Sequence, residues 1–382
     1  MSPSVKSKLS TRAEGTDLSD TSNYYALIMA GGGGTRLWPL STMERPKQML
    51  RLFGEKTLFQ NAVHRLLPLF PVERILVVTN QEQAEQLKVQ CPELPASNFL
   101  LEPEPRGTAP AIGLAAAFLQ RTAPDAILAV LTADHYIGNE RRFVQYLEAA
   151  KEIAREGHLL TLGIEATYPA TQYGYIHQGE ALPSSGAFPA FKVARFKEKP
   201  DAAEAEKMLA QGQHSWNSGM FIWQLSQIMV EFSRQLPDTH QALEAIVADW
   251  ELGRENQVDS ALWDAIQSQT IDFGIMENAA NVVVIPTEEL QWNDVGSWNS
   301  LFEVLEPDEN GNVLIGGDHI SVDSRNSLVH TNGQSKAVVT IGAQDLVVVD
   351  TGEVLLVCSK DQAQDVRQII ELLKEKGLKR YL

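Results

Sequence analysis

Between Tyr24 and Gly163, short runs of apolar residues alternate with segments whose apolar positions recur at helical spacing. Short apolar runs bounded by polar residues are typical of buried strands. They predict strands over Tyr25–Ala30, Arg74–Thr79, Phe99–Glu102, Ala126–Thr132 and His158–Gly163. The helical spacing predicts helices over Leu58–Leu69, Glu82–Val89, Ala109–Gln120 and Arg141–Arg155. Strand and helix in alternation predict an α/β fold with a doubly wound, mostly parallel sheet, in which ligands bind at the carboxyl ends of the strands.

The regular alternation loosens after Ala166. Further strands, Phe191–Phe196 and Met220–Trp223, and helices, Ala203–Leu209 and Leu225–Arg234, indicate a second lobe that closes over the first. The sequence pattern changes after Glu306. Short runs of Val, Ile and Leu, broken by Gly, Asp and Asn, fill 312–358, and the spacing over 362–376 predicts an amphipathic helix. We therefore expect a disordered extension over 1–23, a main domain over 24–305, and a small β unit with a terminal helix over 306–382.

The chain carries 49 acidic against 32 basic residues, a net charge of −17. Such an excess of negative charge repels polyphosphate backbones, so nucleic acid is not expected as the main partner. A phosphorylated ligand must then be held by a few local cations, by backbone amides or by a metal ion. No apolar stretch suits a secretory signal or a membrane span. The two cysteines, Cys91 and Cys358, lie far apart and are expected to be reduced thiols of a cytoplasmic protein.

A run of glycines follows the first predicted strand. The residues in order are Gly31, Gly32, Gly33, Gly34, Thr35 and Arg36. Glycine lets the backbone approach a ligand closely and present successive amides to a phosphate. The spacing excludes two familiar loops, because the third glycine of a dinucleotide fingerprint and the Gly-Lys-Ser/Thr of a Walker loop are both missing. Arg36 and the nearby Lys47 are cations that suit a triphosphate whose leaving pyrophosphate gains charge; the alternative is that both are solvated surface charges.

The run 31–48, with its Arg-Leu-Trp-Pro-Leu-Ser and Pro-Lys-Gln segments, resembles the opening signature of nucleotidyltransferases that act on sugar 1-phosphates. These segments are most similar in sequence to those of bacterial mannose-1-phosphate guanylyltransferases. The resemblance continues from Tyr25 to about Leu305, with separate motifs that occur in the same order. This resemblance implies a Rossmann-like nucleotidyltransferase fold. It also implies that the C-terminal β unit forms a short left-handed β-helix used in dimer contacts, although the sequence over 312–358 is too irregular to predict it.

Two more motifs follow predicted strands. The segment from Glu102 to Pro110 lines the base pocket in the family, where Glu102 can accept both N–H groups of guanine, and Gly107 and Thr108 bind nucleotide. Related enzymes often have Asn where Gly107 stands, so only a backbone contact is expected there. Asp134 ends the fourth strand, a natural place for a Mg²⁺ ligand, and the resemblance implies Asp294 as the second ligand. Alternatively, Asp294 or Ser297 caps the helix that follows.

The resemblance further assigns the sugar phosphate to the second lobe. The residues implied are Tyr173, Gly174, Glu198, Lys199 and Asn217. Lys199 would hold the phosphate, while Glu198 and Asn217 would hydrogen-bond to ring hydroxyls. Without the resemblance, 196–200 would be interpreted as an ordinary strand end and turn.

The implied reaction is the transfer of GMP from GTP to α-D-mannose 1-phosphate, with Mg²⁺ as cofactor and pyrophosphate as the second product. A sugar phosphate is already anionic, so no general base is required and positioning and charge stabilisation suffice. Two alternatives are the same reaction on another sugar 1-phosphate or nucleotide, such as glucose 1-phosphate, and a non-catalytic subunit that senses nucleotide sugars. The retained Arg36, Lys47, Asp134 and Asp294 favour catalysis. The expected partners are the two substrates and a second copy of the chain in a homodimer.

Overall fold

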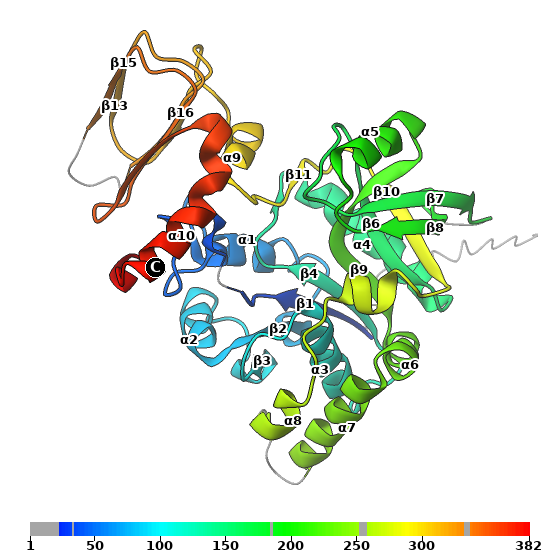
Figure 1. The fold of residues 1–382 in the computed structure, drawn as a ribbon. Helices are drawn as coiled ribbons and strands as arrows, with labels where there is room; N and C mark the ends of the chain where they lie inside the picture. Colours follow the sequence, from blue (N-terminus) through cyan, green and yellow to red (C-terminus); the bar gives the residue numbers. More distant parts are fainter. Residues whose placement is uncertain (1–22, 33, 184–185, 252–257, 332–336) are drawn as a thin grey trace, which may run out of the picture.

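The computed structural model describes residues 23–32, 34–183, 186–251, 258–331 and 337–382. The expected N-terminal extension lies outside these residues, except for Asn23. Figure 1 shows a large α/β part with a smaller β-strand part beside it, and the red helix α10 (Val366–Glu375) running from the small part towards the start of the large one. In the part of the chain that the structure describes, no helix is both long and apolar enough to cross a membrane.

A nine-stranded sheet forms the centre of the large part, in the order β3-β2-β1-β4-β9-β6-β10-β8-β7. Its strands are β1 Tyr24–Met29, β2 Ile75–Asn80, β3 Phe99–Glu102, β4 Ile127–Thr132, β6 Leu159–Glu165, β7 Tyr175–Ala181, β8 Phe191–Lys197, β9 His214–Gln224 and β10 Val282–Thr287. Strands β1 to β4 pair in parallel, as does β6 with β10. Strand β9 runs antiparallel to both β4 and β6, so the sheet is more mixed than the sequence pattern indicated.

Helices cover both faces of this sheet, which confirms the expected doubly wound α/β class. On one face lie α1 (Leu58–His64), α2 (Gln81–Gln90) and α4 (Glu140–Arg155), and on the other α3 (Thr108–Gln120), α6 (Leu225–Gln235) and α7 (Pro237–Glu251). Successive residues of a strand point to opposite faces. Accordingly, Ala26 and Ile28 of β1 belong to the first core and Leu27 to the second. Burial on both faces is the reason why these strands appear in the sequence as continuous apolar runs.

The smaller part is a stack of parallel strands. One stack consists of β12 (Val313–Ile315), β14 (Leu328–His330) and β16 (Leu346–Asp350), and a second pairs β13 (His319–Val322) with β15 (Val338–Ile341). Strand β17 (Leu355–Ser359) then turns back antiparallel along β16. Parallel strands that recur at similar intervals along the chain are the arrangement of a β-helix.

A third apolar cluster joins the two parts. Trp38 and Leu50 from the chain after the glycines pack in one core with Trp298, Val349 and Ile370. The indole N–H of Trp38 donates to the carbonyl of Tyr381 at 2.6 Å. We call the run of glycines that begins at Gly31, just after β1, the glycine turn. The segment between this turn and α1 is therefore held from one side by the C-terminal strands and helix.

Candidate active site

The glycine turn lies directly against Lys47. Gly34 has a left-handed backbone (φ 50°), and a Cβ added there would lie 2.6 Å from the Cβ of Lys47, so no other residue fits this position. Lys47 follows in the short helix η2 (Lys47–Met49), and only 6% of it is exposed. Gly33 lies outside the described residues. The structure thus brings Gly34 and Lys47 together, as the sequence predicts.

Lys47 also connects the two residues proposed as metal ligands. Its ammonium donates to Asp134 Oδ2 at 2.8 Å and to the main-chain carbonyl of Asp294. Asp134 comes directly before β5 (Tyr136–Ile137), and Asp294 directly follows β11 (Trp292–Asn293). These two strands pair antiparallel, which brings the main chain at Asp294 close to that at Asp134 although 160 residues separate them (294 − 134). Burial raises the pKa of Asp134, but the charges of Lys47 and His135 outweigh it and hold the pKa below its usual value.

Asp294 is oriented by its own surroundings. Its Oδ1 accepts from the hydroxyl of Tyr173 at 2.9 Å and from the amide of Gly296 at 3.0 Å. Of the two alternative caps for α9 (Trp298–Val304), Ser297 holds the N-cap position, although its side chain makes no capping hydrogen bond, and Asp294 does not. Among the described residues, Oδ2 of Asp294 has no hydrogen-bond donor, which leaves it available to a ligand.

The donor set fits a hard divalent cation. One lysine reaches groups of both Asp134 and Asp294, so these groups lie within the reach of a single positive charge. Carboxylate oxygens are the ligands that Mg²⁺ prefers, and Mg²⁺ commonly takes only one or two of them together with phosphate oxygens and water. In the described part of the chain, three or more His, Cys, Asp or Glu side chains do not gather into a metal-binding group. His135 accepts a hydrogen bond from the indole of Trp292 at 3.1 Å, and burial lowers its pKa to about 4.

Glu102 lies beneath the glycine turn. Its Oε1 is 3.3 Å from the position of a Cβ on Gly31, and the residue is 6% exposed. Burial raises the pKa of Glu102 to about 7. A carboxyl that titrates near neutrality beside a phosphate loop is typical of a functional position.

The departure from the family at Gly107 has a local reason. Gly107 has φ 86°, and a Cβ there would overlap the carbonyl of Gln269. The neighbouring Ala109 amide donates to that same carbonyl at 3.1 Å. The hydroxyl of Thr108, the first residue of α3, accepts from the amide of Ile271 at 2.8 Å. Gln269 therefore occupies the place that a side chain at 107 would need.

A cavity of about 220 Å³ lies next to Asp294. Its lining includes Thr108, Tyr173, Gly174, Glu198, Asn217 and Asp294. The strands β8 and β9, which the sequence pattern assigns to a second lobe, belong to the same nine-stranded sheet as β1 to β4. A Cβ on Gly174 would overlap the carboxylate of Glu198, so a larger residue there would displace that side chain from the cavity. Glu198 Oε2 and Thr132 Oγ1 are buried without a hydrogen-bond partner among the described residues. Unpartnered buried oxygens suit a ligand with hydroxyl groups, because such a ligand supplies the missing hydrogen bonds.

Three further predicted site residues do not line the 220 Å³ cavity. Lys199 is paired with Glu198 at 3.0 Å, its side chain is 59% exposed, and it does not line the cavity. Arg36 lies in a smaller adjoining cavity of about 40 Å³, which it shares with Asp294. Thr35 lines a separate cavity beside α10 and not the 220 Å³ cavity.

Two residues that the sequence did not indicate also face the site. Asp272 begins a π-helical turn (Asp272–Met276) and lines the 220 Å³ cavity. Its carboxylate accepts a hydrogen bond from the side-chain amide of Asn217 at 2.7 Å. Burial and the charge of Glu198 raise the pKa of Asp272 to about 6. Arg367 of α10 lines the smaller cavity with Arg36. No motif marks either residue, although a π-turn often occurs at functional sites.

Comparison with known proteins identifies the family of the chain. A model of the "Nucleotidyl transferase" family matches residues 25–311, and one of the "MannoseP isomerase/GMP-like beta-helix domain" matches 317–373. The mannose-1-phosphate guanylyltransferase of Klebsiella pneumoniae is 40% identical over 93% of this chain and 75% of its own length. The alginate biosynthesis protein AlgA of Pseudomonas aeruginosa is 39% identical over 92% of this chain and 72% of its own.

A solved structure described as the mannose-1-phosphate geranyltransferase of Thermus thermophilus matches with a TM-score of 0.82 at 36% identity. The match covers 92% of this chain and 99% of that one. Enzymes with this fold generally use a divalent metal ion, which agrees with the paired carboxylates. The glycine turn, the carboxylates at strand ends and the matched range 25–311 lead to one conclusion: the chain belongs to the nucleotidyl transferase family.

Proposed function

We propose that the protein transfers GMP from GTP to α-D-mannose 1-phosphate and releases pyrophosphate. The observation that carries the proposal is Lys47, which touches the glycine turn and binds both Asp134 and the main chain of Asp294. This arrangement concentrates amides, a cation and two carboxylates at one sheet edge, as phosphoryl transfer requires. The names of the relatives at 40% identity support the choice of mannose and guanine.

In this proposal the nucleotide lies over the first half of the sheet. Its triphosphate contacts Gly31, Gly32, Gly34 and the neighbouring Gly33, while Arg36 and Lys47 neutralise it. The base approaches Glu102 and the main chain at Gly107 and Thr108. Glu102 is suited to accept the two N–H donors on one edge of guanine when its carboxyl is ionised.

Asp134 and Asp294 would hold Mg²⁺. The ion supplies positive charge where negative charge develops on the α-phosphate. The protein's own part is to hold both carboxylates in place through Tyr173, Gly296 and Lys47. Because the phosphate of the sugar is already an anion, it attacks without the help of a general base.

The sugar phosphate occupies the 220 Å³ cavity. Glu198, Asn217 and Asp272 accept and donate hydrogen bonds to its hydroxyls, and the main chain at Gly174 lies close enough for direct contact. Lys199 can exchange its partner Glu198 for the incoming phosphate, since most of the lysine side chain is exposed. Both phosphates are then aligned for in-line attack at the α-phosphorus.

The test is a pyrophosphate-release assay over a grid of nucleoside triphosphates and sugar 1-phosphates. We expect the highest rate with GTP and mannose 1-phosphate; a higher rate with another pair changes the specificity and keeps the reaction class. A protein that binds GDP-mannose without any turnover is instead a sensing subunit. A homodimer and a cytoplasmic location remain predictions; apolar residues exposed on the β-helix, such as Ile320, Ile341 and Leu355, support the former.

A further inference from the structure

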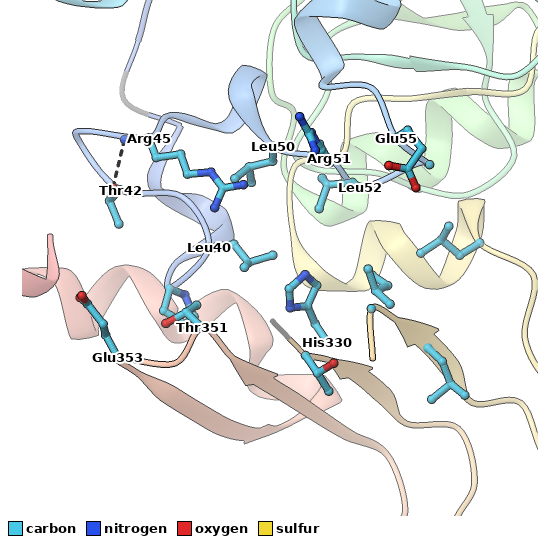
Figure 2. A pocket seen from close by; sticks show the side chains of 17 residues that line it. Leu40, Thr42, Arg45, Leu50, Arg51, Leu52, Glu55, His330, Thr351 and Glu353 are labelled. Atoms are coloured by element: carbon cyan, nitrogen blue, oxygen red, sulfur yellow. Dashed lines mark hydrogen bonds between the residues drawn. The ribbon is translucent and has the colours of Figure 1, made fainter. Parts of the chain in front are cut away.

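A cavity of about 1030 Å³ separates the segment 39–55 from the C-terminal strands and lies outside the site described above. Figure 2 shows Leu40, Arg45 and Leu50 on one side of it and His330 and Thr351 on the other. Its volume is near the upper end of what small-molecule sites require. A cavity of this size between two packed parts of one chain calls for an occupant.

The charges of the cavity favour an anion. Arg45 and Arg51 both line it, and in the part of the chain that the structure describes neither guanidinium forms an ion pair. The two lining carboxylates, Glu55 and Glu353, lie at opposite ends of the cavity in Figure 2, with Arg45 and His330 between them. The centre of the cavity therefore presents unpaired positive charge.

Two polar atoms at the same wall lack a partner. Thr331 is 4% exposed, and its hydroxyl makes no hydrogen bond to the residues described. Nδ1 of His330 is likewise buried and without a described partner. Burial and the charge of Arg45 lower the pKa of His330 to about 4, so the imidazole is neutral at physiological pH and adds no charge. Both atoms have almost no accessible surface, so a ligand in the cavity reaches the Thr331 hydroxyl only if that side chain turns towards it, which would then satisfy a polar group that is unpartnered among the described residues.

We propose that this cavity binds a phosphate monoester of a small organic molecule. A phosphate offers enough oxygens for two guanidinium groups and the hydroxyl of Thr331 together, and arginine binds it in a planar, two-pronged geometry. Leu40, Leu50 and Ile315 form an apolar wall for the organic part. The volume leaves room for such a group, which free phosphate would not fill.

The position of the arginines connects this ligand to catalysis. Lys47 lies between Arg45 and Arg51 in the sequence, and short hydrogen bonds tie the segment together. The amide of Thr42 donates to the carbonyl of Arg45 at 3.0 Å, and that of Leu50 to the carbonyl of Lys47 at 3.0 Å. A ligand that draws the two guanidinium groups inward therefore acts on the backbone that positions Lys47 against the glycine turn. The ligand is expected to alter the use of the nucleotide.

Binding is tested by calorimetry on the full chain with two probes, glucose 6-phosphate and inorganic phosphate. We expect glucose 6-phosphate to bind the wild type, and the double variant Arg45→Gln/Arg51→Gln to weaken it at least about tenfold. Thr331→Val should weaken binding without loss of folding, and Arg141→Gln, a change at an exposed arginine of the large part, should have no effect. No binding to the wild type, or equal binding to the double variant, overturns the proposal.

Two further arms separate this cavity from the active site and ester from free phosphate. The double variant Arg36→Gln/Lys199→Ala removes two cations placed at the catalytic phosphates. If this variant loses glucose 6-phosphate binding while Arg45→Gln/Arg51→Gln keeps it, the new site is refuted. Arginine-dependent binding of inorganic phosphate alone overturns the assignment to an ester. The KM for GTP should change at least about twofold with glucose 6-phosphate in the wild type only. This last readout rests on the proposed function, whereas the binding experiments do not, and an unchanged KM with intact binding refutes the coupling.

Discussion

Replacing Lys47 with methionine should reduce both turnover and stability, and the size of the second effect follows from the structure. The ammonium lies 2.8 Å from Asp134 Oδ2, which corresponds to about 6 kcal/mol of attraction at an effective dielectric constant of about 20. The side chain of Asp134 is 36% exposed and that of Lys47 7%, so solvent screens part of this attraction. Exposed pairs contribute almost nothing and the breaking of buried pairs costs about 3–5 kcal/mol, so we expect a loss of about 2 kcal/mol.

The pH dependence of this loss identifies its cause. Because Lys47 holds the folded pKa of Asp134 below its usual value, the pair stabilises the protein above the unfolded pKa of about 4 and loses this effect as the pH falls through the folded pKa. Urea unfolding of wild type and Lys47→Met should therefore differ at pH 7 and converge in acid. Lys192→Met removes an ion pair of similar length, 3.1 Å, between two exposed side chains and should cost almost nothing.

Turnover of Lys47→Met should fall about 10²–10³-fold, since one cation beside the reacting phosphates is lost. Mg²⁺ should restore part of the lost stability, because it can take the place of the ammonium next to Asp134. A variant that unfolds at the same urea concentration as the wild type at pH 7 and keeps more than about a tenth of the turnover would show that Lys47 is a peripheral residue.

Three other changes test separate parts of the site. Because Glu102 has a pKa of about 7 and must be ionised to accept guanine, the KM for GTP should rise about tenfold per pH unit below 7, and Glu102→Gln should abolish this slope; a flat profile in the wild type excludes the contact. Asp272→Asn should lower kcat/KM for mannose 1-phosphate about tenfold with the KM for GTP unchanged, and equal effects on both substrates would contradict a sugar contact. Gly107→Asn should lower the unfolding free energy by at least about 1 kcal/mol, because the new Cβ meets the carbonyl of Gln269; unchanged melting would show that the loop adapts.

The strands of the parallel half of the sheet could be predicted closely, because each is buried on both faces. The predicted strand Phe99–Glu102 is β3 itself, and Tyr25–Ala30 differs from β1 by one residue at each end. The helix expected over Leu58–Leu69 was too long, since α1 ends at His64 and residues 65–69 form turns. Strand β10 was missed, since a proline in an apolar run argues against an interior strand. Strand β7 was missed because most of its second half is polar and exposed. Met220–Trp223 is only the most apolar part of β9, which begins at His214.

The residues of the candidate site fall into the same two groups, those that a local sequence pattern predicts and those that it does not. Four residues of the site belong to motifs at the ends of the parallel strands β1, β3 and β4, namely Gly34, Lys47, Glu102 and Asp134. The topology alone predicts that these motifs meet. Asp272 could not be predicted in this way, because its place in the cavity depends on a π-turn packed against α6 and on the amide of Asn217. The cation Arg367 comes from the C-terminal helix, and nothing in a local pattern shows which edge of the sheet that helix will reach.

The C-terminal part therefore does more than extend the chain. Trp38, Trp298 and Ile370 share one core, so the helix α10, the helix α9 after Asp294 and the segment after the glycine turn cannot move independently. Packed interiors transmit displacement because they have little free volume. Lys47 lies a few residues from this core and binds Asp134 and Asp294 on its other side. We therefore expect a change in how the β-helix packs against 39–55 to alter the distance between Lys47 and the glycine turn. The cavity between these elements is where a small molecule would produce that change.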